Sequence, residues 1–198
     1  MRKVVPTNAS FIPDNASCAF KGDIFSVYTW PQAMFDGSTK QFEMLKRPDT
    51  VQAIIVKGDQ ILLVHDEQPG RSVRTHFPGG RVDLEDESWL AAAEREILEE
   101  TGLTLANWKL IDVQQPIVKI EWFTPVYLAT NITAEIPQNI DAGGEKIEVI
   151  WRSFDAVRAS VISGAEPTMQ YLLPLFNRLQ SLDDLLNAPE FAGQEVDL

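Results

Sequence analysis

The stretch GGRVDLEDESWLAAAEREILEETGL, Gly79 to Leu103, combines strong negative charge with the apolar pattern of a buried helix. It carries eight acidic residues, yet Leu90, Ala93 and Ile97 recur at the spacing of one helical face. Two arcs of a single helix can hold both properties, because residues about 100° apart separate an apolar side from a charged side. The stretch therefore predicts a helix that packs on a sheet and presents carboxylates beside it.

The helix is expected from Ser88 to Thr101, where Ala, Leu and Glu dominate and Gly102 can end it in the left-handed conformation. Glu96, Glu99 and Glu100 then converge on one patch. Like charges one turn apart repel by a few tenths of a kcal/mol per pair, so a cation is needed to offset them. Mg²⁺ suits such a patch because it prefers oxygen ligands. The alternative is a solvated acidic face, which usually carries interspersed lysines.

Arg95 is the only basic residue of this helix. The run from Arg95 to Leu103, REILEETGL, follows Glu87 after seven residues, and this arrangement resembles the Nudix box. The box is Gly, five residues, Glu, seven residues, Arg-Glu, an aliphatic residue, any residue, Glu-Glu, any residue, Gly and an aliphatic residue. The chain departs from it at one point, because six residues separate Gly80 from Glu87.

The resemblance implies a Mg²⁺-dependent hydrolase, with Mn²⁺ as a substitute, that cleaves a nucleoside diphosphate linked to another moiety. A bound cation would polarise a phosphoryl oxygen and activate water for in-line attack on phosphorus. The family's metal ligands fall on carboxylates of the helix and on one loop carbonyl: Glu96, Glu99, Glu100 and Gly80. The catalytic set would be completed by Glu87 and Arg95, which orient the box.

The substrate is expected to be ADP-ribose or another nucleotide sugar, because the strands before the core resemble those of the ADP-ribose pyrophosphatase branch. In that branch an acid on a later loop acts as base or ligand, and Glu145 lies in the comparable place. Trp30 is a candidate for stacking on the base. The phosphates would be held by arginines and by a tight glycine turn, namely Arg47, Arg71, Arg74, Gly79 and Gly80.

Two other functions stay open at this point. The sequence FPGG before the box favours a nucleoside triphosphate pyrophosphatase, and a Nudix-fold module that senses a nucleotide sugar without cleaving it belongs to a different class. Intact Arg95, Glu96, Glu99 and Glu100 weigh against a retired, non-catalytic site.

Along the chain, four segments are expected: an irregular N-terminal arm at 1–19, a β extension at 20–48, a Nudix hydrolase domain at 49–182 and a frayed acidic tail at 183–198. The domain contains a predicted hairpin with arms at 51–56 and 61–65. The fold class is α/β (α+β), a Nudix-type α/β/α sandwich with a mixed sheet.

Composition limits the partners. The 198 residues carry a net charge of -12 with a pI near 4.6, which disfavours nucleic acid and anionic membranes. One cysteine, Cys18, cannot form an internal disulfide, and no apolar run is long enough to span a bilayer. We expect a cytoplasmic enzyme for a small nucleotide, with no nucleic-acid or membrane partner, assembled as a homodimer through its N-terminal strands.

Overall fold

The computed structural model describes residues 2–140, 144 and 146–197. In chain order its elements are β1 (Arg2–Val5), β2 (Ser17–Lys21), β3 (Ser26–Ala33), β4 (Thr39–Lys46), β5 (Gln52–Lys57), β6 (Gln60–Glu67), β7 (Arg74–His76), α1 (Trp89–Thr101), β8 (Leu103–Gln114), β9 (Ile120–Glu121), β10 (Thr124–Glu135), β11 (Lys146–Ser153), α2 (Phe154–Ser163), the 3₁₀ helix η1 (Pro167–Leu172), α3 (Leu173–Arg178), α4 (Leu182–Leu186) and β12 (Gln194–Asp197). Over the described residues, no helix has both the length and the apolar character needed to cross a membrane.

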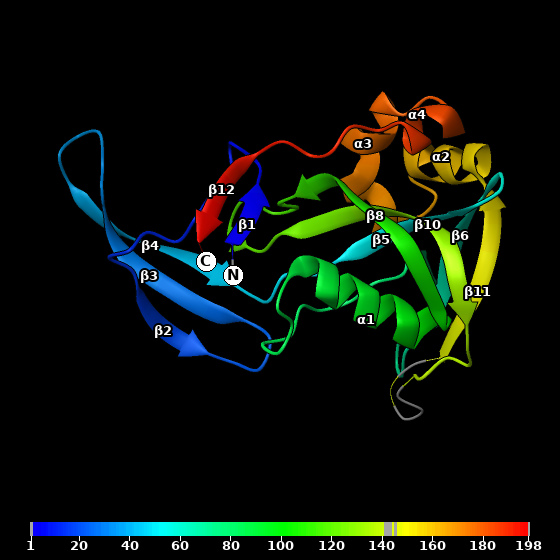
Figure 1. Cartoon of the computed structure of the whole chain (residues 1–198). Coiled ribbons are helices and arrows are strands. Elements are labelled where there is room, and N and C mark those ends of the chain that lie inside the picture. The colour runs from blue at the N-terminus through cyan, green and yellow to red at the C-terminus, as the bar shows by residue number, and fades with distance from the viewer. Residues whose placement is uncertain (1, 141–143, 145, 198) are drawn as a thin grey trace.

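The central sheet has the strand order β11-β6-β5-β10-β8, with β7 paired to β6 (Figure 1). Strands β5 and β10 run parallel and their other neighbours antiparallel, so the sheet is mixed, as predicted. Its central strands are almost continuously apolar because both faces are covered. Ile54 belongs to the core under α2, η1 and α3, whereas Ile55 belongs to the core on the α1 side. The predicted sandwich of helices around a mixed sheet is confirmed.

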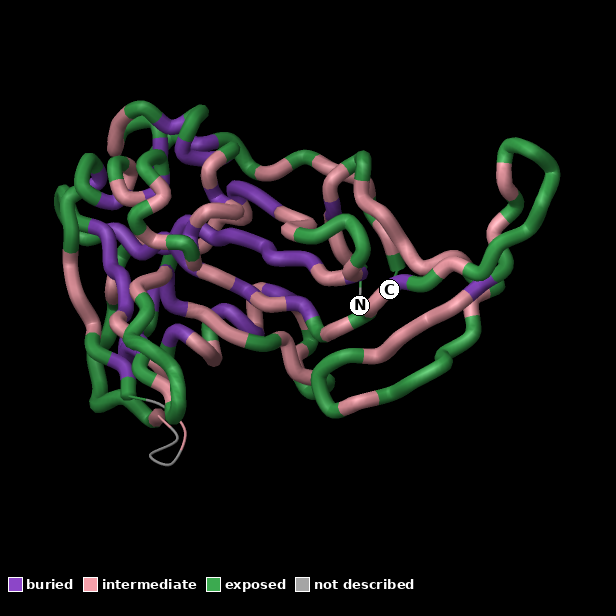
Figure 2. The backbone as a smooth tube through the Cα atoms, turned by 180° about the vertical axis from the view of Figure 1, so that it is seen from behind, coloured by how far each residue is buried: buried purple, intermediate pink, exposed green. Residues whose placement is uncertain are grey.

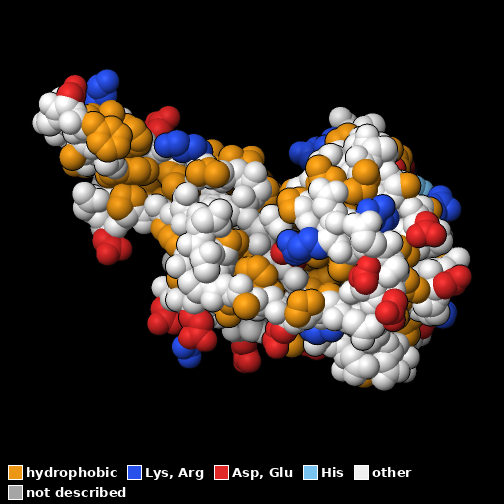
Figure 3. Space-filling model, turned by 90° about the horizontal axis from the view of Figure 1, so that it is seen from above, with side chains coloured by type: hydrophobic (Ala, Val, Ile, Leu, Met, Phe, Trp, Pro, Cys, Tyr) orange, Lys and Arg blue, Asp and Glu red, His pale blue; other side chains and the backbone are white. Residues whose placement is uncertain are grey.

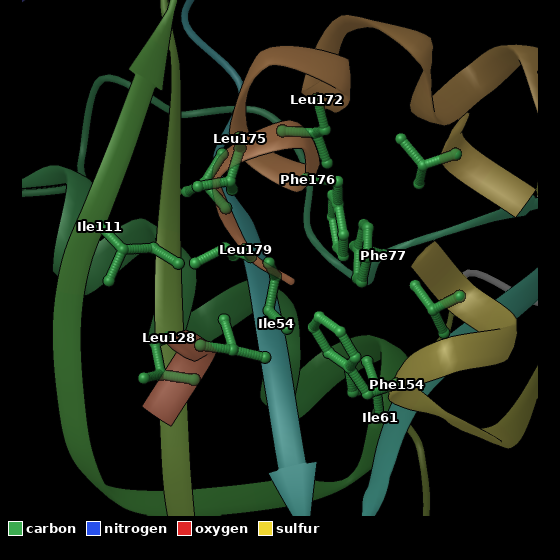
Figure 4. Close-up of a cluster of buried hydrophobic side chains, with 14 of the residues drawn as sticks. Ile54, Ile61, Phe77, Ile111, Leu128, Phe154, Leu172, Leu175, Phe176 and Leu179 are labelled. Atoms are coloured by element: carbon green, nitrogen blue, oxygen red, sulfur yellow. The ribbon is translucent and has the colours of Figure 1, made fainter. Parts of the chain in front are cut away.

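The larger core contains an aromatic group that ties the loop before α1 to the helices on the other face. Phe77 stacks on Phe176 at a centroid distance of 6.0 Å, and Phe154 lies 6.2 Å from Phe176 (Figure 4). Burying one such ring contributes about 2 to 3 kcal/mol. Buried residues gather in this sandwich, while the N-terminal strands are mostly exposed or half-buried (Figure 2). The segment that leads into α1 is therefore anchored on a rigid base.

The predicted hairpin of β5 and β6 is confirmed, but its arms pair only next to the turn, at Val56 with Ile61 and at Lys57 with Gln60. Beyond that point residues 78–80 come between the two strands. The N–H of Val51 donates to the carbonyl of Gly80 at 2.8 Å, and the N–H of Ala53 donates to that of Pro78 at 3.0 Å. The glycine loop is thus built into the sheet.

The N-terminal extension forms a separate four-stranded sheet with the order β2-β3-β4-β9, which projects from the sandwich (Figure 1). The expected β extension is therefore observed. It is joined to the body through β9, which pairs in parallel with the end of β4 at Leu45 and Lys46. Phe25, in the turn before β3, places its ring 5.6 Å from the guanidinium of Arg47. The extension thus reaches a residue that also lies beside the glycine loop.

Both chain ends correct the prediction of an irregular arm and a frayed tail. Strand β1 pairs antiparallel with β12, from Arg2 opposite Asp197 to Val5 opposite Gln194 (Figure 1). Val5 is fully buried, and Arg2 forms an ion pair with Glu195. Each segment satisfies the backbone groups of the other. A local sequence pattern cannot reveal a partner at the opposite end of the chain. The residue limits between the four expected segments stay predictions.

Candidate active site

Helix α1 is held at its start by a cap and by a buried carboxylate. The Ser88 hydroxyl accepts from the N–H of Ala91 at 3.0 Å, and Gly102 ends the helix at φ 72°, as predicted. The indole N–H of Trp89 donates to Asp49 at 2.9 Å. Asp49 is buried and also accepts from Lys3 at 2.7 Å. These contacts fix where the first turn lies.

The buried face of α1 differs in part from the prediction. Ala93 and Ile97 are buried as expected, but Leu90 is only half-buried, and Trp89 and Ala92 take its place. The small alanine side chains allow the helix to approach the sheet closely. The acidic patch therefore lies on a helix that cannot roll without opening the core.

Arg95 is the centre of the site, and its main partner is Asp86. Its Nε donates to Asp86 Oδ1 at 3.1 Å, and a terminal nitrogen donates to Asp86 Oδ2 at 2.8 Å, which is the bidentate geometry of a strong pair. The same terminal nitrogen donates to the carbonyl of Arg81 at 2.8 Å. The prediction that Glu87 would pair with Arg95 is corrected, since Glu87 is exposed and Asp86 occupies that position.

The extra loop residue explains this change of partner. Five residues separate Gly80 from Asp86, which is the box spacing, and the surplus residue falls between the acid and Arg95. It is accommodated before α1 begins at Trp89, where Glu87 faces solvent. The loop upstream keeps its own turn, because the N–H of Asp83 donates to Asp86 at 2.8 Å. The departure from the family pattern thus leaves the arginine–carboxylate pair intact.

Charge coupling in this cluster is visible in the direction of the pKa shifts. The hydrogen bond from Arg95 lowers the pKa of Asp86. The hydrogen bond to Asp86 in turn raises the pKa of Arg95, which stays a permanent cation. Burial raises the pKa of Glu96, although Arg95 opposes that effect through a 2.8 Å ion pair. Glu99 lies 3.4 Å from Arg95 as the weaker, half-exposed partner.

Glycine is required at positions 79 and 80 for different structural reasons. Gly79 has φ 141°, and a Cβ there would lie 2.1 Å from the carbonyl oxygen of Val51. Its N–H donates to Glu100 Oε2 at 2.8 Å, so the loop orients this carboxylate. A Cβ at Gly80 would lie 2.3 Å from an oxygen of Glu96. Only a glycine at this position lets the Glu96 carboxylate lie against the loop backbone.

The donor set fits a hard divalent cation in kind. Glu96, Glu99 and Glu100 supply carboxylate oxygens, and the carbonyl of Gly80 keeps a second lone pair beside its bond from Val51. Within the described part of the chain, no group of three or more His, Cys, Asp or Glu side chains is arranged to hold a metal ion. Glu96 and Glu99 are turned towards Arg95, so they would have to rotate to bind a cation.

A cleft of about 230 Å³ adjoins the glycine loop. Its wall includes four residues that the sequence singled out for the substrate: Arg47, Arg74, Gly79 and Gly80. The guanidinium of Arg47 lies 4.6 Å from the ring centroid of Trp122, which is a cation–π contact, and burial lowers the pKa of Arg47. The Trp122 indole N–H donates to Thr50 at 3.0 Å. Cations and one aromatic face thus meet beside the acidic helix.

Two other candidates, Trp30 and Arg71, lie outside the cleft. Trp30 is buried in the projecting sheet, 6.2 Å from Phe42, and its indole N–H donates to Gln32. Arg71 is exposed in the turn after β6 and is not among the described residues that line the cleft. Glu145 lies outside the described residues, so its role stays a prediction.

Sequence reasoning missed four residues of this region: Asp86, Trp122, Gln52 and Asp66. Only Asp86 had a usable signal, because it follows Gly80 at the spacing of the box. Trp122 lies in the break between β9 and β10, where no periodicity marks a residue that lines a cleft. Gln52 and Asp66 are single polar residues in apolar strands and read locally as strand ends.

Comparisons with known proteins agree with this fold. A model of the NUDIX domain matches residues 46–176. A crystal structure of an ADP compounds hydrolase aligns with a TM-score of 0.63 at 18% identity, covering 84% of this chain and 94% of that one. A NUDIX hydrolase from Nitrosomonas europaea aligns with a TM-score of 0.54 at 22% identity, covering 73% and 92%. At identities this low, the two structural alignments establish a shared fold alone. No curated protein sequence matches the chain.

Proposed function

Because the chain belongs to the NUDIX domain family and is a pyrophosphohydrolase of that family, we propose that it cleaves the pyrophosphate of a nucleoside diphosphate linked to a sugar, with ADP-ribose as the best candidate. The products would be a nucleoside monophosphate and a phosphorylated sugar. Nudix hydrolases generally use divalent metal ions, and we propose Mg²⁺ here, with Mn²⁺ as a substitute.

The observation that carries the proposal is that the acidic patch of α1 and a cleft lined by arginines meet at the glycine loop. The acidic patch of α1 touches the glycine loop through Glu96 and Glu100, and Gly79 and Gly80 of that loop also line a cleft with Arg47 and Trp122. A substrate that spans both needs phosphates for the cations and an aromatic base for the indole face. The crystallised ADP compounds hydrolase of the same fold agrees with this substrate class.

Each group has a defined task in this proposal. Glu96, Glu99 and Glu100 would hold the cation, which supplies charge for a phosphoryl oxygen and acidifies a water molecule. Asp86 and the carbonyl of Arg81 fix the guanidinium of Arg95. Arg95 then keeps Glu96 and Glu99 close together despite their repulsion. Because the two carboxylates would move apart without this cation, Arg95 acts as a positioning residue.

The direct test is phosphate-coupled turnover on a panel of substrates with Mg²⁺ and with Mn²⁺. The panel contains ADP-ribose, other nucleotide sugars, dinucleoside polyphosphates and triphosphates. We expect fastest turnover on a nucleotide sugar and none after chelation. If triphosphates are cleaved best, the substrate proposal is wrong while the reaction class stands. If none is cleaved, a nucleotide-sugar sensor becomes the better account.

We also propose that the chain forms a homodimer through its projecting sheet. All five residues of β2 are exposed, and large apolar side chains gather on this sheet (Figure 3), with Phe20 61% exposed and Phe35 fully exposed. Burying these apolar side chains against a second copy of the chain favours dimerisation. Light scattering with the double variant Phe20→Ser/Phe35→Ser tests this, since the variant should be monomeric.

Cys18 is an exposed thiol, which suits the reducing cytoplasm that we propose as the compartment of this protein.

A further inference from the structure

Two residues that line the cleft each carry a buried oxygen that lacks a donor among the described residues. Among the described residues, no hydrogen-bond donor reaches Gln52 Oε1 or Asp66 Oδ1. Both residues line the cleft beside the glycine loop, and Asp66 is only 8% exposed. A buried acceptor without a partner is costly, and native proteins retain one where a bound molecule completes it. Rotation about the last side-chain bond can turn either oxygen to such a molecule.

The surroundings of Asp66 show which kind of ligand would satisfy it. Its other oxygen already accepts from Gln68 Nε2 at 3.2 Å and faces His76 Nε2 at 3.6 Å. The Nδ1 of His76 lies 2.8 Å from the carbonyl of Phe77, which can only accept, so Nδ1 carries the ring proton. The remaining oxygen of Asp66, Oδ1, therefore needs a hydrogen-bond donor, and Arg74, which lies opposite Asp66 on β7, lines the same cleft.

The same cleft offers a ligand two kinds of partner. Arg47, Arg74 and Trp122 offer cations and an aromatic face, while Gln52 and Asp66 offer acceptors. A nucleobase and phosphates suit the cations and the indole ring. A group rich in hydroxyls suits Gln52 and Asp66, because hydroxyls donate to both oxygens.

We propose that Gln52 and Asp66 recognise the hydroxyls of the second sugar of the substrate and so select nucleotide sugars over nucleotides that end in phosphate. This assignment rests on the proposed function, whose substrate class it deepens. Gln52 acts by attraction, since its oxygen gains a donor. Asp66 acts in the same way, because its buried oxygen also lacks a donor among the described residues. Sites built to hydrogen-bond a hydroxyl reject analogues that lack it, since their polar groups are left unpaired.

The test compares equilibrium binding of ADP-ribose with that of ADP in metal-free calorimetry, so that no turnover is required. The two ligands share base, ribose and diphosphate and differ in the second sugar. In Gln52→Met we expect ADP-ribose to bind about tenfold more weakly, the cost of one buried hydrogen bond, with ADP unchanged. In Asp66→Asn we expect ADP-ribose to bind more weakly with ADP unchanged, because a hydrogen bond to an amide oxygen is weaker than one to a carboxylate. Gln114→Met, a half-buried glutamine on β8, is the matched control.

Several results would overturn the assignment. These are an unchanged preference in both variants, an equal loss for both ligands, or wild-type protein that does not prefer ADP-ribose. Unfolding midpoints accompany each titration, and Gln52→Met alone decides if Asp66→Asn does not fold. If the wild type hydrolyses no substrate but prefers ADP-ribose, and the variants lose that preference, the proposed function fails and the recognition of the sugar stands.

Discussion

Replacing Asp86 with asparagine should lower the stability of the protein far more than the same change at Glu87. Asp86 is 8% exposed and forms two hydrogen bonds with Arg95, at 3.1 and 2.8 Å. Hydrogen bonds to charged groups contribute about 1.5 to 3 kcal/mol. Because Arg95 is 29% exposed and keeps Glu96 as a partner, we expect a value near the lower end, about 2 kcal/mol. For a chain of this size, that is a drop in Tm of about 4 to 8 °C.

The pH dependence gives the prediction a second readout. The pKa of Asp86 is lowered from its ordinary value of 3.8, so its contribution is fully present above that value and is lost as the pH falls through the folded-state pKa. The stability gap between wild type and Asp86→Asn should therefore stay constant from pH 7 to 5 and narrow at lower pH. Chemical unfolding across this range measures it, with Glu87→Gln expected within about 0.5 kcal/mol of wild type. A larger loss in Glu87→Gln than in Asp86→Asn would refute the assignment of the partner.

The remaining predictions concern the loop and the cleft. Gly80→Ala should displace the Glu96 carboxylate and lower kcat by about tenfold or more while the unfolding midpoint changes little, which steady-state kinetics and thermal unfolding together can check. Arg47→Lys loses the planar contact with Trp122 and should raise KM about tenfold with kcat preserved; an unchanged KM would remove Arg47 from the substrate site.

Much of the α1 region follows from local sequence, for reasons that the structure makes clear. Ser88 and Gly102 cap the helix through bonds within one or two turns, so their roles are visible in a short window. The mixed sheet was expected because alternating strand and helix patterns constrain the layers. The resemblance of REILEETGL to a family box predicted the family, and the family match over residues 46–176 confirms that prediction.

What local sequence could not provide were contacts between distant segments. Asp49 reaches α1 from 40 positions away, and β1 pairs with β12 across almost the whole chain. The insertion of residues 78–80 between β5 and β6 likewise depends on tertiary packing. The cleft was hard to predict for the same reason, because Trp122 follows β9 and Asp66 belongs to β6, and the two meet only after folding.

The most direct test of the central claim is the initial rate of ADP-ribose hydrolysis as a function of Mg²⁺ concentration, measured for wild type and Glu100→Gln. Glutamine keeps an oxygen that can accept from the N–H of Gly79, so the loop should remain in place. We predict that the wild-type rate depends on Mg²⁺ in a saturable way and that Glu100→Gln lowers the rate about a thousandfold, with the unfolding midpoint preserved. Hydrolysis without added metal after chelation, or a folded Glu100→Gln with wild-type turnover, would contradict it.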